Sequence, residues 1–85
     1  MNLYIINDVL RDYTPGMAVI AAESMPHCET IFMNEFGYEG RGPEDDVYAE
    51  QSNQELQKEF NTARIKVIEN VNHPEGVVAY EYGGG

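Results

Sequence analysis

The sequence predicts an α+β domain in which an antiparallel or mixed four-stranded sheet carries one main helix on a single face. Runs rich in β-branched and aromatic residues lie near both ends of the chain, and a capped apolar stripe of helical spacing lies between them. Short connections that contain proline and glycine favour turns between successive strands. The expected order is β-β-α-(α)-β-β, in a single domain over residues 1–85.

The first two strands are expected at residues 3–10 and 17–22, LYIINDVL and MAVIAA, as an antiparallel hairpin. Both runs consist mainly of residues that favour extended backbone. In the intervening RDYTPG, Pro15 presets φ for the first central position of a type II turn, and Gly16 accepts the positive φ of the second. We therefore expect Pro15 and Gly16 to lie in the loop between the strands.

The main helix is expected to begin after Ser24 and to end at Gly37. Ser24 can cap the N-terminus, and Pro26 falls in the first turn, where a missing N–H costs no hydrogen bond. Glycine suits the position that follows a last turn. Apolar residues recur at helical spacing and predict one stripe that packs on the sheet residues Ile5 or Ile6, Val19, Ile65 and Val67. The stripe consists of Met25, Cys28, Ile31, Phe32 and Phe36.

Residues 37–52 are expected to form a long acidic loop within the domain. This segment, GYEGRGPEDDVYAEQS, contains three glycines, a proline and five acids, and connections of such length are usually functional or mobile. Residues 53–60, NQELQKEF, are expected to follow as a short helix capped by Asn53, with Leu56 and Phe60 facing inward.

The last two strands are expected at residues 63–71 and 77–82. In ARIKVIENV, apolar residues alternate with polar ones, which predicts a strand with one wet face. The intervening NHPEG favours a tight hairpin, with Pro74 at the first central position and Gly76 where a positive φ is needed.

The last strand also suggests how the protein associates with itself. Period-two spacing puts Tyr80 and Tyr82 on one side, with Val78 beside them. One helix cannot cover both sheet faces, so if this side points away from the helix it is an exposed apolar surface suited to a partner or a second copy. We predict a homodimer through Val78, Tyr80 and Tyr82.

The negative charge is concentrated in the middle of the chain. The formal net charge is −10, and residues 23–59 hold ten acids against two bases, so −8 of the −10 lies there. Such a field repels nucleic acid and anionic lipid and attracts basic protein surfaces. The expected partner is therefore a basic, nucleic-acid-binding surface of a larger protein, with no direct contact to nucleic acid or membrane.

Carboxylates spaced along a surface can stand in for phosphates in a groove lined by arginine and lysine, and interleaved tyrosines add contact area. The alternative is that the acids only keep the protein soluble. If the segment is a binding surface, its predicted residues are Tyr38, Glu39, Glu44, Asp45, Asp46, Tyr48, Glu50, Glu55 and Glu59.

Catalysis, metals and other cofactors are not expected. His27 and Cys28 are adjacent on the predicted helix, so their side chains point about 100° apart and cannot form a Cys–His pair. Cys28 lies on the apolar stripe, which favours a buried structural thiol. The run Glu44-Asp45-Asp46 lacks the ligand spacing and central glycine of a calcium loop.

The chain is expected to work in the cytoplasm. It has one cysteine and so can form no intrachain disulfide, which fits a reducing compartment. The segment MNLYIINDVLRDY has no basic region, and its apolar run is broken by Asn7 and Asp8, so a signal peptide is not expected. No apolar stretch approaches the ~18 residues of a membrane span.

In size, in charge and in the acidic run from Glu39 to Glu59, the chain resembles small accessory proteins encoded by phages and mobile elements. Some of these, including anti-CRISPR and other anti-defence proteins, inhibit host nucleases by occupying their nucleic-acid grooves. The resemblance implies a non-enzymatic inhibitor that acts as a nucleic-acid mimic and binds stoichiometrically.

Two other functions stay open. The element order and the C-terminal Gly84-Gly85 resemble the ubiquitin-like fold and its small sulfur-carrier relatives, which end in a flexible Gly-Gly that is adenylated at the carboxylate. That resemblance implies a carrier that uses the Gly85 carboxylate. The third alternative is a homo-oligomeric accessory protein whose tyrosine-rich strand self-associates.

Overall fold

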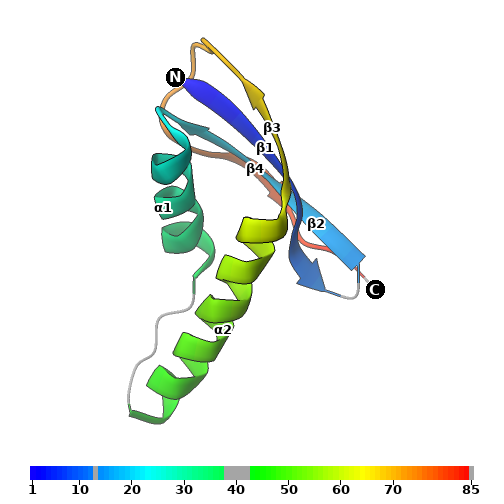
Figure 1. The fold of residues 1–85 in the computed structure, drawn as a ribbon, viewed down its shortest axis with the longest axis vertical. Coiled ribbons are helices and arrows are strands. Elements are labelled where there is room, and N and C mark those ends of the chain that lie inside the picture. Colours follow the sequence, from blue (N-terminus) through cyan, green and yellow to red (C-terminus); the bar gives the residue numbers. More distant parts are fainter. Residues whose placement is uncertain (13, 38–42, 85) are drawn as a thin grey trace.

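The predicted α+β class is confirmed: four strands form one antiparallel sheet, and two helices pack against it (Figure 1). The computed structural model describes residues 1–12, 14–37 and 43–84, with the backbone alone at 12 and 43–49. The strand order is β3-β1-β2-β4, so the two long N-terminal strands are central. The elements are β1 (Asn2–Asp12), β2 (Thr14–Ala22), α1 (Met25–Phe36), α2 (Pro43–Thr62), β3 (Arg64–Ile68) and β4 (Gly76–Glu81).

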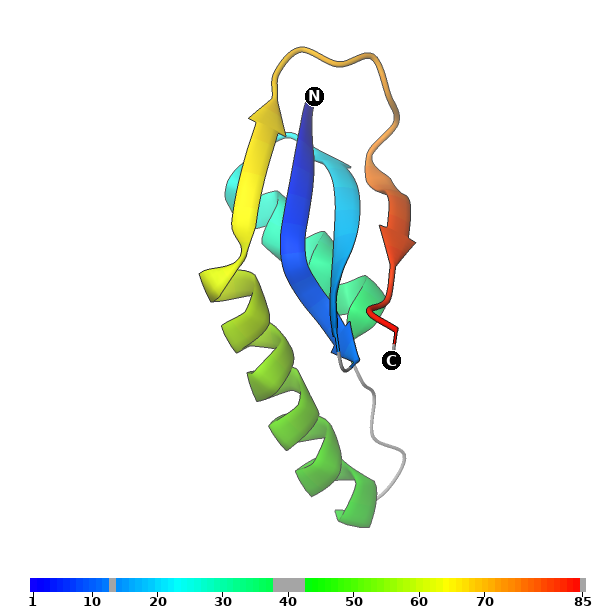
Figure 2. The same ribbon diagram turned by 90° about the vertical axis from the view of Figure 1, so that its right-hand side faces the viewer.

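Both helices cover the same face of the sheet. Figure 2 looks onto the other face, with α1 behind the strands. α1 lies over β2 and β4, and α2 lies over β1. On this covered face, Tyr4 pairs with Ile20 and Ile6 pairs with Ala18, and all four are buried. Since successive residues of a strand point to opposite faces, the residues between them lie on the open face.

The core lies between the sheet and the helices, and its largest fully buried side chains are Phe32, Ile6, Ile20, Val9 and Cys28. The predicted stripe of α1 is confirmed at Cys28 and Phe32, with Ile31 and Phe36 packed at the margin of the core. It is wrong at Met25, which is 37% exposed in the first turn. Of the expected sheet partners, Ile6 belongs to the core, whereas Ile5 and Val19 pair on the open face.

The predicted ends of α1 are confirmed. The Ser24 hydroxyl accepts the His27 N–H at 3.4 Å, and Pro26 lies in the first turn. The Gly37 N–H donates to the Met33 carbonyl at 2.9 Å, and Gly37 itself is extended, with φ −71°. The chain therefore leaves the helix without the left-handed residue that often follows a last turn.

The long acidic loop predicted at residues 37–52 is wrong, because the backbone is helical from Pro43 onward. α2 has 20 residues, and the short helix predicted at 53–60 is its C-terminal part. Proline is favoured at the first helical position, and carboxylates in the first turn interact favourably with the helix dipole. The inward-facing positions were predicted correctly, since Phe60 is in the core and Leu56 packs against it.

The turn predicted at Pro15 and Gly16 is wrong, because β2 already begins at Thr14 and both residues lie inside the strand. The partner strand is irregular at this end. Asp8 and Leu10 both have positive φ, at 66° and 52°, and the β1–β2 register shifts on either side of Val9. Beyond these irregularities the Leu10 carbonyl accepts the N–H of Gly83, a residue that follows the edge strand β4, at 3.0 Å.

The tight hairpin predicted between the last two strands is also wrong. β3 and β4 occupy opposite edges, and residues 69–75 cross the end of the sheet between them (Figure 2). The crossing is held where the Val71 N–H donates to the Met1 carbonyl at 2.9 Å and where His27 Nε2 contacts the Glu75 carboxylate. The prediction of a positive φ at Gly76 is confirmed, at 135°.

Candidate functional site

The acidic residues of α2 occupy a helix that extends beyond the end of the sheet (Figure 1). Glu50 and Glu55 are exposed, and Glu59 is partly buried where its carboxylate accepts the Arg11 N–H at 3.1 Å. Of the other predicted partner-binding residues, Tyr38 and Glu39 lie outside the described residues. The structure describes the backbone alone at Glu44, Asp45, Asp46 and Tyr48, which lie in the first two turns of α2.

The average density of acidic positions along α2 is close to that of phosphates in a nucleic acid strand, although the gaps between successive acids are unequal. Residues 44–59 span about 22 Å of helix axis at a rise of ~1.5 Å per residue. Six acids and one base, Lys58, fall in this interval, which is about one acidic position per 4 Å of axis. Phosphates follow one another at ~3.4 Å along a single strand of duplex DNA. The helix therefore presents negative charge at a density near that of a phosphate backbone.

A polar link holds α2 to α1 and brings further acids into the helix layer. The Gln57 amide donates to Glu29 Oε1 and to Asn61 Oδ1, both at 2.9 Å. Glu29 is thereby held beside α2, and Glu35 is exposed on the same helix, α1. A shallow hollow on α1 is lined by Pro26, Glu29, Thr30, Met33 and Asn34. Nothing in the sequence marks this link, because Gln57 carries no charge and belongs to no motif.

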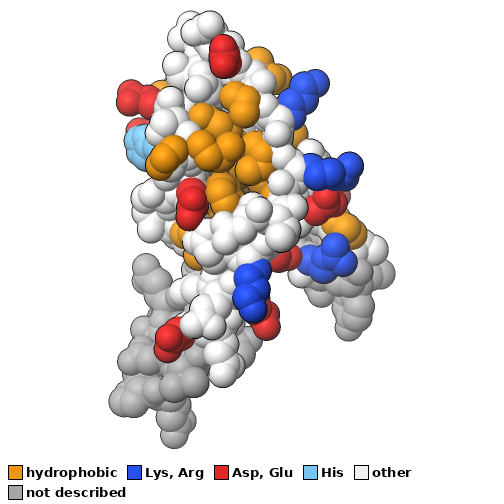
Figure 3. All heavy atoms as spheres, viewed as in Figure 1, with side chains coloured by type: hydrophobic (Ala, Val, Ile, Leu, Met, Phe, Trp, Pro, Cys, Tyr) orange, Lys and Arg blue, Asp and Glu red, His pale blue; other side chains and the backbone are white. Residues whose placement is uncertain are grey.

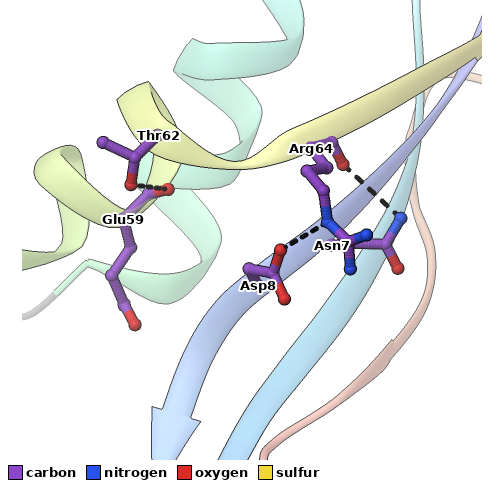
Figure 4. Close-up of polar contacts among 5 residues, drawn as sticks. All are labelled: Asn7, Asp8, Glu59, Thr62 and Arg64. Atoms are coloured by element: carbon purple, nitrogen blue, oxygen red, sulfur yellow. Dashed lines mark hydrogen bonds and ion pairs between the residues drawn. The ribbon is translucent and has the colours of Figure 1, made fainter.

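Basic residues lie at the edge strand β3. The Arg64 Nε donates to Asp8 Oδ2 at 2.7 Å, and the Asn7 amide donates to the Arg64 carbonyl at 3.4 Å (Figure 4). The hydrogen bond and charge of Asp8 raise the pKa of Arg64 above its ordinary value. Lys66 follows two residues later and is exposed. In Figure 3, most of the visible Lys and Arg side chains lie along the right-hand margin of the molecule.

The tyrosines predicted to form a dimer surface lie on the helix side of β4. Tyr80 pairs with the buried Ala18, and its ring meets that of Phe36 edge-on at 5.2 Å. Tyr82 lies 6.3 Å from Phe36 and 5.8 Å from Tyr80, measured between ring centroids. Tyr80 and Tyr82 are 54% and 55% exposed, so their rings lie at the surface beside the core and contact it through Phe36. The condition that this row points away from the helix is not met, and Val78, 42% exposed, lies at a register shift.

The Cys28 side chain is buried beneath α1, and the pKa of its thiol is raised to about 11 by this burial and, secondarily, by the charge of Glu29. A thiol with so high a pKa is a poor nucleophile at neutral pH. His27 Nε2 contacts the Glu75 carboxylate, and His73 Nδ1 lies 2.6 Å from the Pro74 carbonyl oxygen. Among the side chains that the structure describes, those of residues 1–11, 14–37 and 50–84, no group of three or more His, Cys, Asp or Glu could hold a metal ion.

We expect Cys28 to resist alkylation in the folded protein and to react quickly once it is unfolded. Its raised pKa also predicts that stability falls with rising pH: the unfolded thiol ionises near its ordinary pKa of 9.0, the folded one only near 11, so stability is lost over that interval. Urea titrations of the parent and Cys28→Ala at increasing pH measure this. A parent and variant that lose stability in parallel above pH 9 would contradict the prediction.

The C-terminal glycines are tied to the β1–β2 end of the sheet. Gly83 is buried, and its N–H donates to the Leu10 carbonyl at 3.0 Å. The Gly84 N–H donates to the Thr14 hydroxyl at 2.9 Å, and that hydroxyl donates to the Gly84 carbonyl at 2.7 Å. Nothing in the sequence marks Thr14 as the partner of a residue 70 positions away.

No protein-family model matches this chain, and comparisons with curated proteins and with solved structures find no match either. Neither helix, over the residues that the structure describes, combines the length and apolar character needed to cross a bilayer.

Proposed function

We propose that this protein is a small, non-enzymatic binding protein of the cytoplasm that occludes a basic, nucleic-acid-binding surface of a larger protein. The observation that carries the proposal is the arrangement of acidic positions along α2, at a density near that of a phosphate backbone, on a helix that extends past the sheet. A host-defence nuclease is one partner that such a mimic would inhibit. Arginine and lysine side chains of its groove would bind the carboxylates as they bind phosphates.

A helix is better suited to this role than a loop. Leu56 and Phe60 anchor α2 in the core, and the Gln57 amide holds it to Glu29 of α1. The C-terminal part of α2, with Glu55 and Glu59, is therefore held in place before the partner arrives, and the helix carries the other acidic positions outward from it. The remaining cost is the removal of water from the carboxylates, which a groove rich in arginine offsets through charge-assisted hydrogen bonds.

The carrier function has less support than the binding function. A carrier needs a free C-terminal tail, so that an activating enzyme can reach its carboxylate. Here the backbone of Gly83 and Gly84 is hydrogen-bonded to Leu10 and Thr14, and Gly83 is buried. These hydrogen bonds would have to break before an activating enzyme could bind the tail.

Neutralising the acids of α2 is expected to slow association with the basic partner and to flatten the salt dependence of its rate. The test variant is the double replacement Glu50→Gln and Glu55→Gln, whose side chains are exposed and lie away from the helix N-terminus. We expect about a tenfold slower association at low salt, because attraction between opposite charges accelerates encounter. The melting temperature should hardly change, because exposed carboxylates contribute little to stability.

The matched control is Glu23→Gln with Glu69→Gln, which removes the same charge from exposed positions outside α2. The partner is first captured from a cell extract on the immobilised protein and eluted with duplex DNA, and association is then followed with the purified partner over a range of salt. Equal rates for test and control variants, or capture that duplex DNA does not reverse, would contradict the proposed function.

A further inference from the structure

The open face of the sheet has an apolar centre. Strand register arranges its residues in three rows that run from β3 through β1 and β2 to β4. The described face carries seven apolar side chains across these rows, and none of them belongs to the core cluster under the helices. The rows are Ile68, Leu3, Ala21 and Gly76; Lys66, Ile5, Val19 and Ala79; and Arg64, Asn7, Met17 and Glu81.

Six of these seven side chains are incompletely covered, and the seventh, Ala21, is buried. Ile68 is 41% exposed, Ala79 is exposed, and the other four, Leu3, Ile5, Met17 and Val19, are partly exposed. Contiguous apolar surface of this kind on a small protein marks an interaction site more often than a solvent-facing surface.

Opposite charges stand at opposite edges of the same face. Arg64 and Lys66 lie on β3, and Glu81 lies on β4. Arg64 and Glu81 fall in one row, separated by Asn7 and Met17 on the central strands. The face is therefore basic at one edge, apolar in the middle and acidic at the other edge.

We infer that this face binds a second copy of the chain, through a two-fold axis parallel to the strands. Such an axis reverses the order of strands across the interface, so β3 of one copy lies over β4 of the other. Arg64 then faces the partner's Glu81, and the same contact recurs on the other side of the axis. A two-fold axis perpendicular to the strands in the interface plane would instead set β3 over β3 and bring like charges together.

The geometry and the charge favour a second copy over an unrelated protein. Two sheets pack face to face about 10 Å apart with strands inclined by about 30°, and the apolar rows suit that arrangement. The row that runs from Arg64 to Glu81 is complementary to itself under the two-fold axis, whereas the row of Lys66 ends at Ala79 and adds no ion pair. A four-stranded face gives an interface at the small end of the usual range, which predicts a dimer that dissociates at micromolar concentration. Both helix layers face outward in this dimer, so it does not rest on the proposed function of α2.

The first test is sedimentation equilibrium from low to high micromolar concentration. The chain has a mass of 9.6 kDa, and we expect the parent to approach twice that mass. Val19→Lys puts a charge in the middle of the open face and should leave a monomer. Val67→Lys is the matched control: Val67 is 42% exposed but pairs with the buried Tyr4, on the helix side of the sheet. It should dimerise like the parent, and circular dichroism checks that both variants fold.

The second test reverses the edge charges. Arg64→Glu alone and Glu81→Arg alone should each weaken the dimer by about tenfold, because each sets like charges against one another across the interface. The double variant should dimerise within about threefold of the parent, since the attraction is restored with its sign exchanged. The exposed Arg64–Asp8 pair is lost in both variants that carry Arg64→Glu, so the melting temperatures of both are measured alongside.

Three results would overturn the inference. A parent that stays at the monomer mass at high micromolar concentration excludes the dimer. This is also the result expected if the open face binds lipid or another protein instead of a second copy. Disruption by Val67→Lys with no effect of Val19→Lys moves the interface to the helix side. Failure of the double charge reversal to restore association excludes the axis parallel to the strands.

Discussion

Replacing Phe32 by alanine is expected to lower the free energy of unfolding by about 3–5 kcal/mol. The Phe32 side chain is fully buried, and its ring lies 5.2 Å from those of both Phe36 and Phe60, measured between centroids. It thus joins α1, α2 and the sheet at one point. The cavity left by its removal is bounded by the sheet on one side and by a second helix on the other, so the surroundings can collapse only in part.

Thermal and urea unfolding measure this loss. For a domain of this size, 1 kcal/mol corresponds to a shift of about 4–8 °C in melting temperature, so the expected shift is at least ~12 °C. The control is Tyr82→Ala, which also removes a ring that meets Phe36 but is 55% exposed, and which should cost about 1 kcal/mol. Equal shifts for the two variants would contradict a core centred on Phe32.

The contact between Phe32 and Phe60 also connects the core to the proposed site on α2. Phe60 is the residue of α2 buried in the core, and its ring contact with Phe32 helps to fix the direction in which the helix extends. A milder variant, Phe60→Leu, should keep the fold and loosen that direction. Binding of the basic partner should then weaken although every acid is still present.

Helix α1 could be predicted from the sequence because its signals are local. Ser24 and Gly37 mark its ends through hydrogen bonds made within one turn, and Pro26 marks its start because a first-turn residue needs no N–H. The stripe at Cys28 and Phe32 follows from the helical period alone. Met25 fell on the same stripe, but whether a first-turn residue is covered depends on how far the sheet extends. That is a property of the assembled fold and has no counterpart in the local pattern.

The extent of α2 was harder to predict, because residues 43–52 carry little apolar periodicity. One local signal did exist: Pro43 followed by Glu44-Asp45-Asp46 is a proline at the first helical position with acids in the first turn. The acidity that suggested a loop is thus compatible with the start of a helix. Of the predicted acids, Glu55 and Glu59 were expected on a helix and lie on one, whereas Glu44, Asp45, Asp46 and Glu50 were expected in a loop and also lie on α2.

The strand order, and the face of the sheet on which Tyr80 and Tyr82 lie, could not be predicted for a different reason. The segment 69–75 suits a hairpin by composition, yet β1 and β2 pair with each other and leave one free edge each, which β3 and β4 then occupy. Period-two spacing correctly put Tyr80 and Tyr82 on one side. Which side that is depends on the β2–β4 register, which shifts between Val19 and Ile20. The row that joins Arg64 to Glu81 is equally a product of register.

Replacing Gly16 by alanine is expected to cost about 3 kcal/mol, at the upper end for an overpacked site. A Cβ at this position would overlap the Glu81 carbonyl oxygen and lie 2.8 Å from the Gly83 nitrogen and 2.9 Å from the Val9 carbonyl oxygen. All three are backbone atoms, so no side chain can rotate away. The strain can be relieved only if β4 and the C-terminal segment separate from β2, which would also break the Gly83–Leu10 hydrogen bond.

The measurement is urea unfolding combined with amide hydrogen exchange, which reports on the hydrogen bonds of β4 and Gly83 directly. Gly84→Ala is the control, because a Cβ there meets no atom within 4 Å. It adds the same methyl group one residue beyond the close approach and should change stability by less than about 0.5 kcal/mol. Equal losses for the two variants would show that the close approach is not the reason for glycine at position 16, and that glycine acts there through the unfolded chain or a turn. A selective loss at Gly16, with faster exchange in β4, would show that glycine is required there because three backbone segments meet.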